Sequence, residues 1–318
     1  MKCGCWRSSI FCGPWGNESH GLLHCVRNDE RRVNREPLLT RHSEAPFIRH
    51  CESPIIRHCE GRRPVAIHPP QHPMLTLVSA TRLSEQAFYR VSLLGPCMPR
   101  LGEFGPVALR LAHGNTRALA EVYNEAIEEA APDDVLVFLH DDVRVDDWML
   151  AQRLQEALQH FDVVGVAGNT RVQDRQVAWY LQPEQPGVPS PWDHGHLSGA
   201  IGHGSPRSRI TMYGPAPQAV RLLDGVFLAA RAGRLQQSGV RFDPTLAFHF
   251  YDLDFCLQAH RAGLRLGTWP IAITHASGGE SIQTQSWADA RLVFLKKWFA
   301  DCHGPAAPAM TSEACGNP

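Results

Sequence analysis

The stretch Val135–Leu139 constrains the fold of this chain most, because it places five apolar residues in a row. An uninterrupted apolar run of this length is typical of a strand buried on both faces, as in the parallel sheet of an α/β domain. Three polar residues, His140, Asp141 and Asp142, follow it directly. Ligands of open α/β sheets bind outside the carboxyl ends of the strands, so these side chains form a candidate site. Adjacent carboxylates at such an edge can hold a hard divalent cation.

A solvated turn before the next helix is the alternative explanation for these polar residues, with Asp146 or Asp147 as the helix N-cap. The motif alone supports both explanations equally.

Strands and helices alternate from Met74 onward, which predicts right-handed βαβ units and a mostly parallel sheet flanked by helices. The predicted strands cover about residues 75–80, 107–111, 135–139, 163–167 and 271–275. The predicted helices run from Ser84 to about Leu94, from Asn115 or Thr116 to Ala130, from Asp147 to Gln159, from Asp252 to Gly263, and through Trp287 to Phe299. The predicted fold class is α/β.

The first 73 residues differ in kind from the rest. They hold six of the ten cysteines and an eight-residue repeat, RHSEAPFI, RHCESPII and RHCEGRRP. The repeat has no helical or strand period, so we predict a disordered leader, or translated upstream sequence before a true start at Met74. The less favoured alternative is a zinc site, because the thiolates and imidazoles of this region suit zinc. A folded domain over 74–303 and a disordered tail over 304–318 complete the predicted organisation.

The overall charge argues against several partners. The formal net charge is −1, which points neither to nucleic acid nor to an anionic membrane surface. No apolar run approaches the roughly 18 residues of a membrane span, and the N-terminus lacks the order of a signal peptide. We therefore expect a cytoplasmic protein with no transmembrane segment, and peripheral contact with the inner membrane stays open.

A second acidic motif, Tyr251-Asp252-Leu253-Asp254, opens a predicted helix. Carboxylates are favoured in the first turn of any helix, but one that faces a metal–phosphate site can also serve as a general base. His275 ends the last predicted strand and is a candidate metal ligand, although a lone histidine there is more often a packed core or rim residue.

Taken in chain order, these motifs resemble glycosyltransferase family 2, of the GT-A fold, and in particular bacterial members with a histidine in the metal motif. The resemblance spans about Leu75 to Phe299, and His140-Asp141-Asp142 matches the Asp-x-Asp motif of that family. It implies that Asp142 binds Mn²⁺ or Mg²⁺, and through the cation a nucleotide-diphosphate sugar donor. It also implies that Asp252 is the catalytic base.

The resemblance further implies contacts for other residues. Nucleotide contacts fall to Thr81, Arg82, Asn115, His140 and Asp141, a second metal ligand is His275, and acceptor contacts fall to Asp224, Gly225, Asp254 and Trp192. Arg261 is an alternative to Arg82 for the phosphates.

The implied reaction is metal-dependent, inverting transfer of a sugar to a hydroxyl of a saccharide, lipid-linked or protein acceptor. The stretch 183–217, rich in proline, glycine and histidine, predicts a mobile lid in which Trp192 or Tyr213 stacks on a sugar. Two other functions compete with this one: a metal-dependent phosphohydrolase using His140, Asp141 and Asp142, and a non-catalytic nucleotide- or carbohydrate-binding relative.

Overall fold

The computed structural model describes residues 73–184, 188–204, 209–276 and 284–300. The predictions for the leader up to residue 72, its zinc alternative, and the tail over 304–318 lie outside these ranges.

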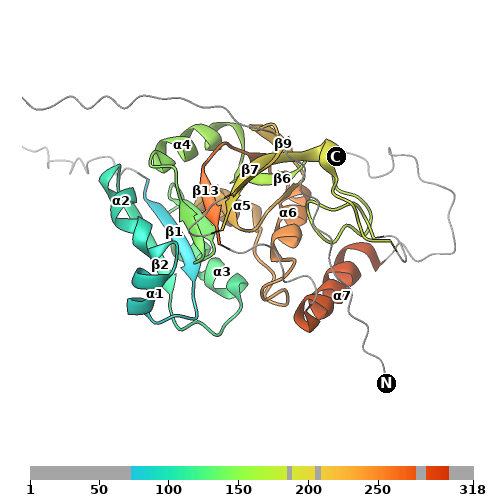
Figure 1. Cartoon of the computed structure of the whole chain (residues 1–318), viewed down its shortest axis with the longest axis horizontal. Helices are drawn as coiled ribbons and strands as arrows, with labels where there is room; N and C mark the ends of the chain where they lie inside the picture. The colour runs from blue at the N-terminus through green and yellow to red at the C-terminus, as the bar shows by residue number, and fades with distance from the viewer. Residues whose placement is uncertain (1–72, 185–187, 205–208, 277–283, 301–318) are drawn as a thin grey trace, which may run out of the picture. The chain divides into compact units, whose positions relative to one another are not determined.

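A seven-stranded sheet forms the centre of the described chain (Figure 1). Its strands lie in the order β2 (Val107–Ala112), β1 (Leu75–Ala80), β3 (Val135–Leu139), β11 (Phe227–Arg231), β5 (Val163–Gly165), β12 (Leu266–Thr268) and β9 (Gln218–Val220). Five of these strands run in one direction, and β11 and β9 run in the other. The α/β fold class and the mostly parallel sheet are therefore confirmed.

A second, smaller sheet lies beside the first. Its strands are β10 (Leu222–Leu223), β6 (Ala167–Asn169), β7 (Leu197–His203), β13 (Ile273–His275) and β4 (Val143–Val145), and β8 (Arg209–Gly214) pairs with β7. The pairing of β13 with β4 is antiparallel and sets His275 opposite Val143. This register decides the position of the candidate site, because Val143 follows the polar residues that end β3.

Helices cover both sheets. They are α1 (Glu85–Val91), α2 (Met98–Glu103), α3 (Leu119–Glu129), α4 (Leu150–His160), α5 (Ala232–Ser238), α6 (Tyr251–Arg261) and α7 (Gln285–Phe299), with short 3-10 turns at Gly95–Cys97 and His194–His196. Among them, α3 packs on β1 and β3, α4 on β5 and β11, and α6 on β10 and β12. In Figure 1 the blue-green α1 and α2 lie at the β1–β2 side, and the red α7 lies beyond α6.

Strand β3 is buried along its whole length, as its five apolar residues predict. It pairs with β1 on one side and β11 on the other, and the rings of Tyr123, Phe242 and Phe255 extend the core around its Phe138. Burial on both faces at the centre of a sheet requires the apolar run, and it also leaves the polar residues after Leu139 at the sheet edge.

Helix starts differ from several predictions. Ser84 does cap α1, where its hydroxyl accepts a hydrogen bond from Ala87 N. However, α3 begins at Leu119, α4 at Leu150 and α6 at Tyr251, and none of their N-caps makes a side-chain hydrogen bond. Local propensity favours Asn and Asp as caps, but packing of the apolar face fixed where these three helices begin.

The predicted strand over 163–167 is two strands in two sheets. β5 ends at Gly165 and pairs with β11 and β12, whereas β6 begins at Ala167 and pairs with β7 and β10. The chain thus crosses between sheets at Val166. A continuous apolar run cannot show such a change of partner.

The stretch 183–217 is not the single long loop that we expected. Strands β7 and β8 form an antiparallel hairpin within it, and residues 185–187 and 205–208 lie outside the described ranges. The glycines and histidines of β7 interrupt the alternation of apolar and polar residues that would predict a strand. Pairing with β6 and β13 stabilises β7 instead.

No helix in the described ranges is both long and apolar enough to span a bilayer.

Candidate active site

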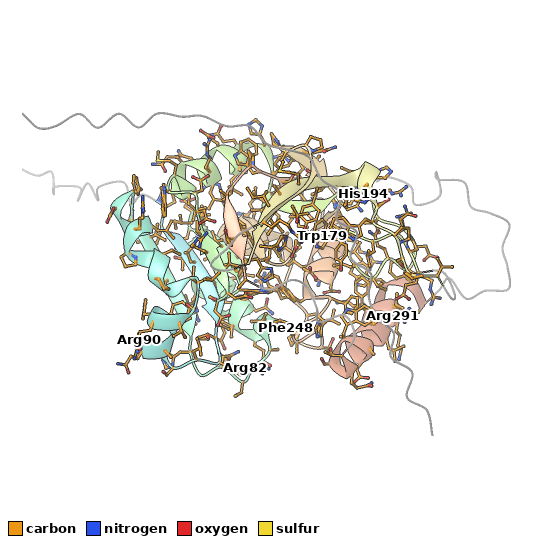
Figure 2. All side chains as sticks on the ribbon, viewed as in Figure 1. Arg82, Arg90, Trp179, His194, Phe248 and Arg291 are labelled. Carbon is orange, nitrogen blue, oxygen red and sulfur yellow. The ribbon has the colours of Figure 1, made fainter. Side chains whose placement is uncertain are left out.

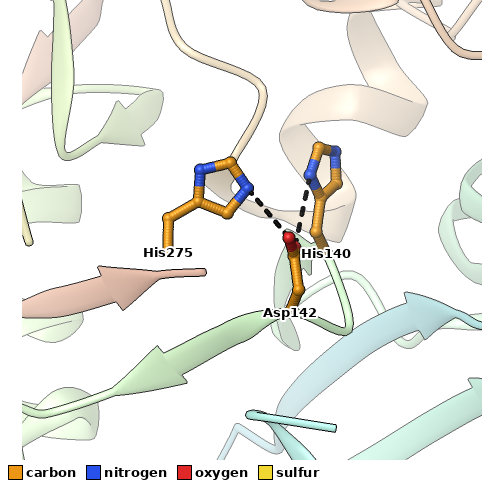
Figure 3. Close-up of side chains that lie close together, drawn as sticks. All are labelled: His140, Asp142 and His275. Atoms are coloured by element: carbon orange, nitrogen blue, oxygen red, sulfur yellow. Dashed lines mark ion pairs between the residues drawn. The ribbon is translucent and has the colours of Figure 1, made fainter. Parts of the chain in front are cut away.

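Three side chains with metal-binding groups meet between β3 and β13. His140 and Asp142 follow β3, and the pairing of β13 with β4 brings in His275. The Asp142 carboxylate lies 3.3 Å from Nε2 of His275 and 4.0 Å from Nδ1 of His140. Figure 3 shows both imidazole rings directed at that carboxylate. We call these residues the His140–Asp142–His275 cluster.

Burial and charge set the protonation of the cluster. Burial lowers the pKa of His140 and outweighs the charge of Asp142, which acts to raise it, while the neighbouring His275 lowers it further. Burial acts to lower the pKa of His275, but the hydrogen bond and charge of Asp142 outweigh this effect and raise it. The same pairing keeps the pKa of Asp142 below its ordinary value in spite of burial. The carboxylate is therefore ionised and ready to bind a cation.

The cluster fits a divalent metal ion. The ligand atoms of the three residues lie within 4.8 Å of one another. Small side-chain shifts would therefore bring all three to bond lengths of about 2.1 Å from one ion. The Asp142 side chain is 36% exposed, so a bound ion would keep positions open for a ligand. Two imidazoles and one carboxylate suit a transition metal better than Mg²⁺, which prefers oxygen ligands.

His140 lies with the candidate metal ligands, and the nucleotide contact predicted for it stays a prediction. The pairing of β13 with β4, which are remote in sequence, places a second histidine beside it.

Tyr251 contacts His140 at the ring nitrogen that faces away from Asp142. The buried Tyr251 hydroxyl lies 2.8 Å from Nε2 of His140 and donates to the carbonyl of Gly225, also at 2.8 Å. On the other side, the ring of Phe248 stacks on His140 with centroids 5.8 Å apart. Neither Tyr251 nor Phe248 was predicted to belong to the site. An aromatic residue next to an acidic motif carries no signal for either role.

Asp252, the predicted base, lies in the first turn of α6. Its carboxylate accepts hydrogen bonds from Gly225 N at 3.1 Å and Leu253 N at 2.9 Å. Burial, followed by the charge of Asp224, raises the pKa of Asp252 to about 7. A carboxylate with this pKa is suited to accept a proton near neutral pH.

Gly225 connects the two parts of the site. Its carbonyl accepts from Tyr251, and its N–H donates to Asp252. A Cβ atom on Gly225 would lie 2.5 Å from the Tyr251 hydroxyl oxygen and 2.8 Å from Cβ of Asp252. Only glycine fits here, which explains the Asp224-Gly225 pair in the turn before β11.

A cavity of about 930 Å³ opens in front of Asp142. Its lining includes four of the residues predicted to contact the nucleotide, Thr81, Arg82, Asn115 and Asp141, together with the predicted metal ligand Asp142 and with Phe248. Its volume is within the range of small-molecule sites. Figure 2 shows Arg82 and Phe248 in the lower part of the view, toward α1 and α3.

The cavity floor is ordered by hydrogen bonds. The Thr81 hydroxyl donates to the Asp141 carboxylate at 2.5 Å, and the Asp141 carbonyl accepts from Leu93 N and Leu94 N. Asp141 is therefore held between β1 and the segment after α1. Arg82 is exposed at the rim, and it has no ion pair among the described residues.

Asp254 has different partners from the acceptor contact that we predicted. It is fully buried, and its carboxylate accepts from Trp298 Nε1 at 2.7 Å and pairs with Lys297 of α7 at 2.7 Å. Arg261 also faces α7, where its guanidinium lies 4.0 Å from the ring centroid of Trp298. Both residues therefore join α6 to α7.

Trp192 lies in an aromatic cluster rather than in an isolated lid. Its ring stacks on Tyr213 and His194, with centroids 5.7 Å and 5.4 Å away, and Tyr180 meets it edge-on. Burial and the charge of Asp224 raise the pKa values of Tyr180 and Tyr213, which places these hydroxyls within electrostatic range of Asp224. His194 and the neighbouring Trp179 are labelled beside β7 in Figure 2.

Comparison with known proteins assigns a family. Among solved structures, the chain is similar to A197 from STIV, at 12% identity over 62% of this chain and 82% of that one, with a TM-score of 0.34. It is also similar to GalNAc-T7 solved with UDP, GalNAc and Mn²⁺, at 13% identity over 73% of this chain, with a TM-score of 0.39. The match spans 49% of the GalNAc-T7 chain. No curated protein matches significantly. Residues 107–298, more than half of the chain, match the glycosyltransferase-like family, and the chain therefore belongs to that family.

Proposed function

We propose that the chain is a metal-dependent glycosyltransferase that moves a sugar from a nucleotide-diphosphate donor to an acceptor hydroxyl with inversion. One arrangement carries the proposal: the candidate metal cluster shares Asp142 with a cavity of about 930 Å³, and its His140 contacts Tyr251, the residue before the Asp252 carboxylate with its raised pKa. Membership of the glycosyltransferase-like family supports the same reaction class. The narrower assignment to family 2 is part of the proposal.

The cavity is the proposed donor site. The nucleoside would lie against Thr81 and Asn115, and the diphosphate would extend to Asp142. The exposed guanidinium of Arg82 offers a planar set of donors to phosphate oxygens at the rim. Phe248, 52% exposed between the cavity and His140, offers a ring face to the base or the sugar.

The proposed metal is Mn²⁺, held by His140, Asp142 and His275. The two imidazoles favour it over Mg²⁺, and the carboxylate suits it. When bound, such an ion neutralises the charge that develops on the departing diphosphate.

Asp252 is the proposed general base. The hydroxyl oxygen of the acceptor forms a bond to the anomeric carbon, and its proton passes to the Asp252 carboxylate. The bond from the anomeric carbon to the diphosphate breaks, and the nucleoside diphosphate leaves. Attack from the face opposite the leaving group inverts the anomeric configuration, and no covalent enzyme intermediate forms.

The proposed acceptor is a saccharide that enters past Asp224 and Gly225. Asp224 lies within electrostatic range of the hydroxyls of Tyr180 and Tyr213, and the exposed ring edge of Trp192 continues this surface. Aromatic rings with polar ends suit sugars, because one part contacts C–H groups and the other donates hydrogen bonds.

Calorimetric titration of uridine diphosphate into the full chain, with and without Mn²⁺, tests the proposal. We expect binding that requires Mn²⁺ and is lost in Asp142→Ala. Asp174→Ala, which removes an exposed carboxylate outside the cluster, is the matched control and should bind as the parent does. Binding that depends on neither Mn²⁺ nor Asp142 would contradict a metal–nucleotide site.

Product analysis with a panel of nucleotide sugars then separates the three functions. Transfer to an added saccharide supports the proposal. Release of free sugar or phosphate without any acceptor would favour the phosphohydrolase, and binding without turnover would favour the non-catalytic relative.

A further inference from the structure

The hydroxyl of Tyr251 is the one polar group of this buried ring, and it has two neighbours. It donates to the carbonyl of Gly225 and lies 2.8 Å from Nε2 of His140. The ring is only 3% exposed, and the aromatic rings of Tyr123 and Phe242 pack against it at centroid distances of 6.2 Å and 6.0 Å. The hydroxyl therefore has little freedom to change partners.

The hydrogen bonds of the Tyr251 hydroxyl determine which ring nitrogen of His140 carries a proton. A carbonyl oxygen only accepts hydrogen bonds, so the single proton of the Tyr251 hydroxyl goes to Gly225. The hydroxyl oxygen is then the acceptor of its second contact, and Nε2 of His140 must carry a proton to donate. With the proton on Nε2, Nδ1 is the ring nitrogen whose lone pair is available to a metal ion.

The Nδ1 atom of His140 is the ring nitrogen that faces Asp142. Nδ1 is the His140 atom that lies 4.0 Å from the Asp142 carboxylate, opposite the atom bound to Tyr251. Phe248 stacks on the ring face and limits rotation about the side chain. A histidine ligand needs both an unprotonated nitrogen and a fixed ring direction, and here both come from outside the cluster.

We propose that Tyr251 is a positioning residue that selects the Nε2-protonated tautomer of His140 and aims Nδ1 into the metal site. The inference deepens the proposed function and rests on its metal site.

Nitrogen-15 NMR of the metal-free full chain tests the tautomer directly. We expect His140, assigned by its loss in His140→Ala, to show protonated Nε2 and unprotonated Nδ1. In Tyr251→Phe we expect a mixture of tautomers. A His140 signal with protonated Nδ1 in the parent would overturn the proposal, and so would an unchanged Nε2-protonated signal in Tyr251→Phe.

Calorimetric titration with Mn²⁺ alone tests the consequence for the site. Loss of the partner that orients a metal-binding histidine weakens binding by about 10- to 100-fold, and we expect this range for Tyr251→Phe. Tyr123→Phe is the matched control: it removes another buried hydroxyl, one that contacts Leu139 O and not the cluster, and should leave Mn²⁺ affinity unchanged. Equal losses in the two variants would overturn the proposal, because general loosening of the core would explain both.

A double-mutant cycle shows whether Tyr251 acts through His140. In a His140→Ala background, Tyr251→Phe should change Mn²⁺ affinity by less than about 2-fold. A loss as large as in the parent would contradict the inference while leaving the proposed function intact. Absence of Mn²⁺ binding by the parent would instead contradict the metal site of the proposed function, and the NMR measurement would still decide the tautomer.

Discussion

At the scale of single residues, the site depends on one backbone unit. The carbonyl of Gly225 accepts from Tyr251 and its N–H donates to Asp252, so Gly225 supports both the contact of the proposed metal ligand His140 and the proposed base. Both contacts are made by backbone atoms of Gly225. Such a role cannot be recognised from the residue type alone.

Gly225→Ala should therefore damage both halves of the site. The new Cβ would fall 2.5 Å from the Tyr251 hydroxyl oxygen and 2.8 Å from Cβ of Asp252, and both residues would have to move. We expect at least 10-fold losses in Mn²⁺ affinity and in kcat. Gly102→Ala, where a Cβ meets nothing within 4 Å, is the control and should change neither. Loss of kcat with unchanged Mn²⁺ affinity would show that the two contacts are independent.

Asp252 should give the reaction a characteristic pH dependence. Its folded pKa is raised to about 7, and a base acts only when deprotonated, so kcat/KM should rise with pH. The charge of a bound cation lowers this pKa, which places the midpoint at or below about pH 7. Burial and then the charge of Asp224 cause the shift, and hence Asp224→Asn should move the midpoint to lower pH. Asp252→Asn should lower kcat by about 100-fold or more and leave Mn²⁺ binding in place. A flat profile would exclude Asp252 as the base.

At the scale of elements, the sequence predicted the strand and the helix that carry the two acidic motifs. The apolar run before His140 and the acidic start of α6 are local signals, and both are where they were expected. No local signal places His275 beside His140 and Asp142, because that contact depends on the pairing of β13 with β4, whose paired residues are about 130 positions apart. The contacts of Asp254 could not be predicted either, because its partner Lys297 lies in α7, far away in the sequence.

The contact between α6 and α7 supplies the prediction at this scale. Trp298→Phe removes the N–H that donates to the fully buried Asp254 carboxylate and should lower the free energy of unfolding by about 1–3 kcal/mol. Denaturant unfolding measures the change. Trp148→Phe is a suitable control, because its indole N–H makes no hydrogen bond within the described ranges. Mn²⁺ affinity should be unchanged in both variants, and a changed acceptor KM in Asp254→Asn would support the acceptor contact predicted for Asp254.

At the scale of the whole described chain, the site is assembled from both sheets. The cavity proposed for the donor lies beside β1 and the start of α3, and the cluster joins the end of β3 in the larger sheet to β13 in the smaller one. The proposed base, Asp252, lies in α6. The alternation of strands and helices predicted the larger sheet, whereas the smaller sheet is made of short strands whose pairing the sequence does not indicate. The cytoplasmic location stays a prediction.

A cation bound where the two sheets meet should stabilise the fold. His275 is 133 and 135 residues from Asp142 and His140 in the sequence, so only the folded chain brings the three ligands together and binds the ion tightly. At 100 times its Kd, a ligand that binds only the folded state adds about 2.7 kcal/mol, or roughly 5–10 °C in Tm for a domain of this size. We expect Mn²⁺ to produce such a rise in thermal unfolding, Mg²⁺ a smaller one, and a chelator to reverse both. Asp142→Ala should abolish the rise, and Asp174→Ala should keep it. An equal response to Mn²⁺ in the parent and in Asp142→Ala would place the stabilising ion elsewhere in the chain.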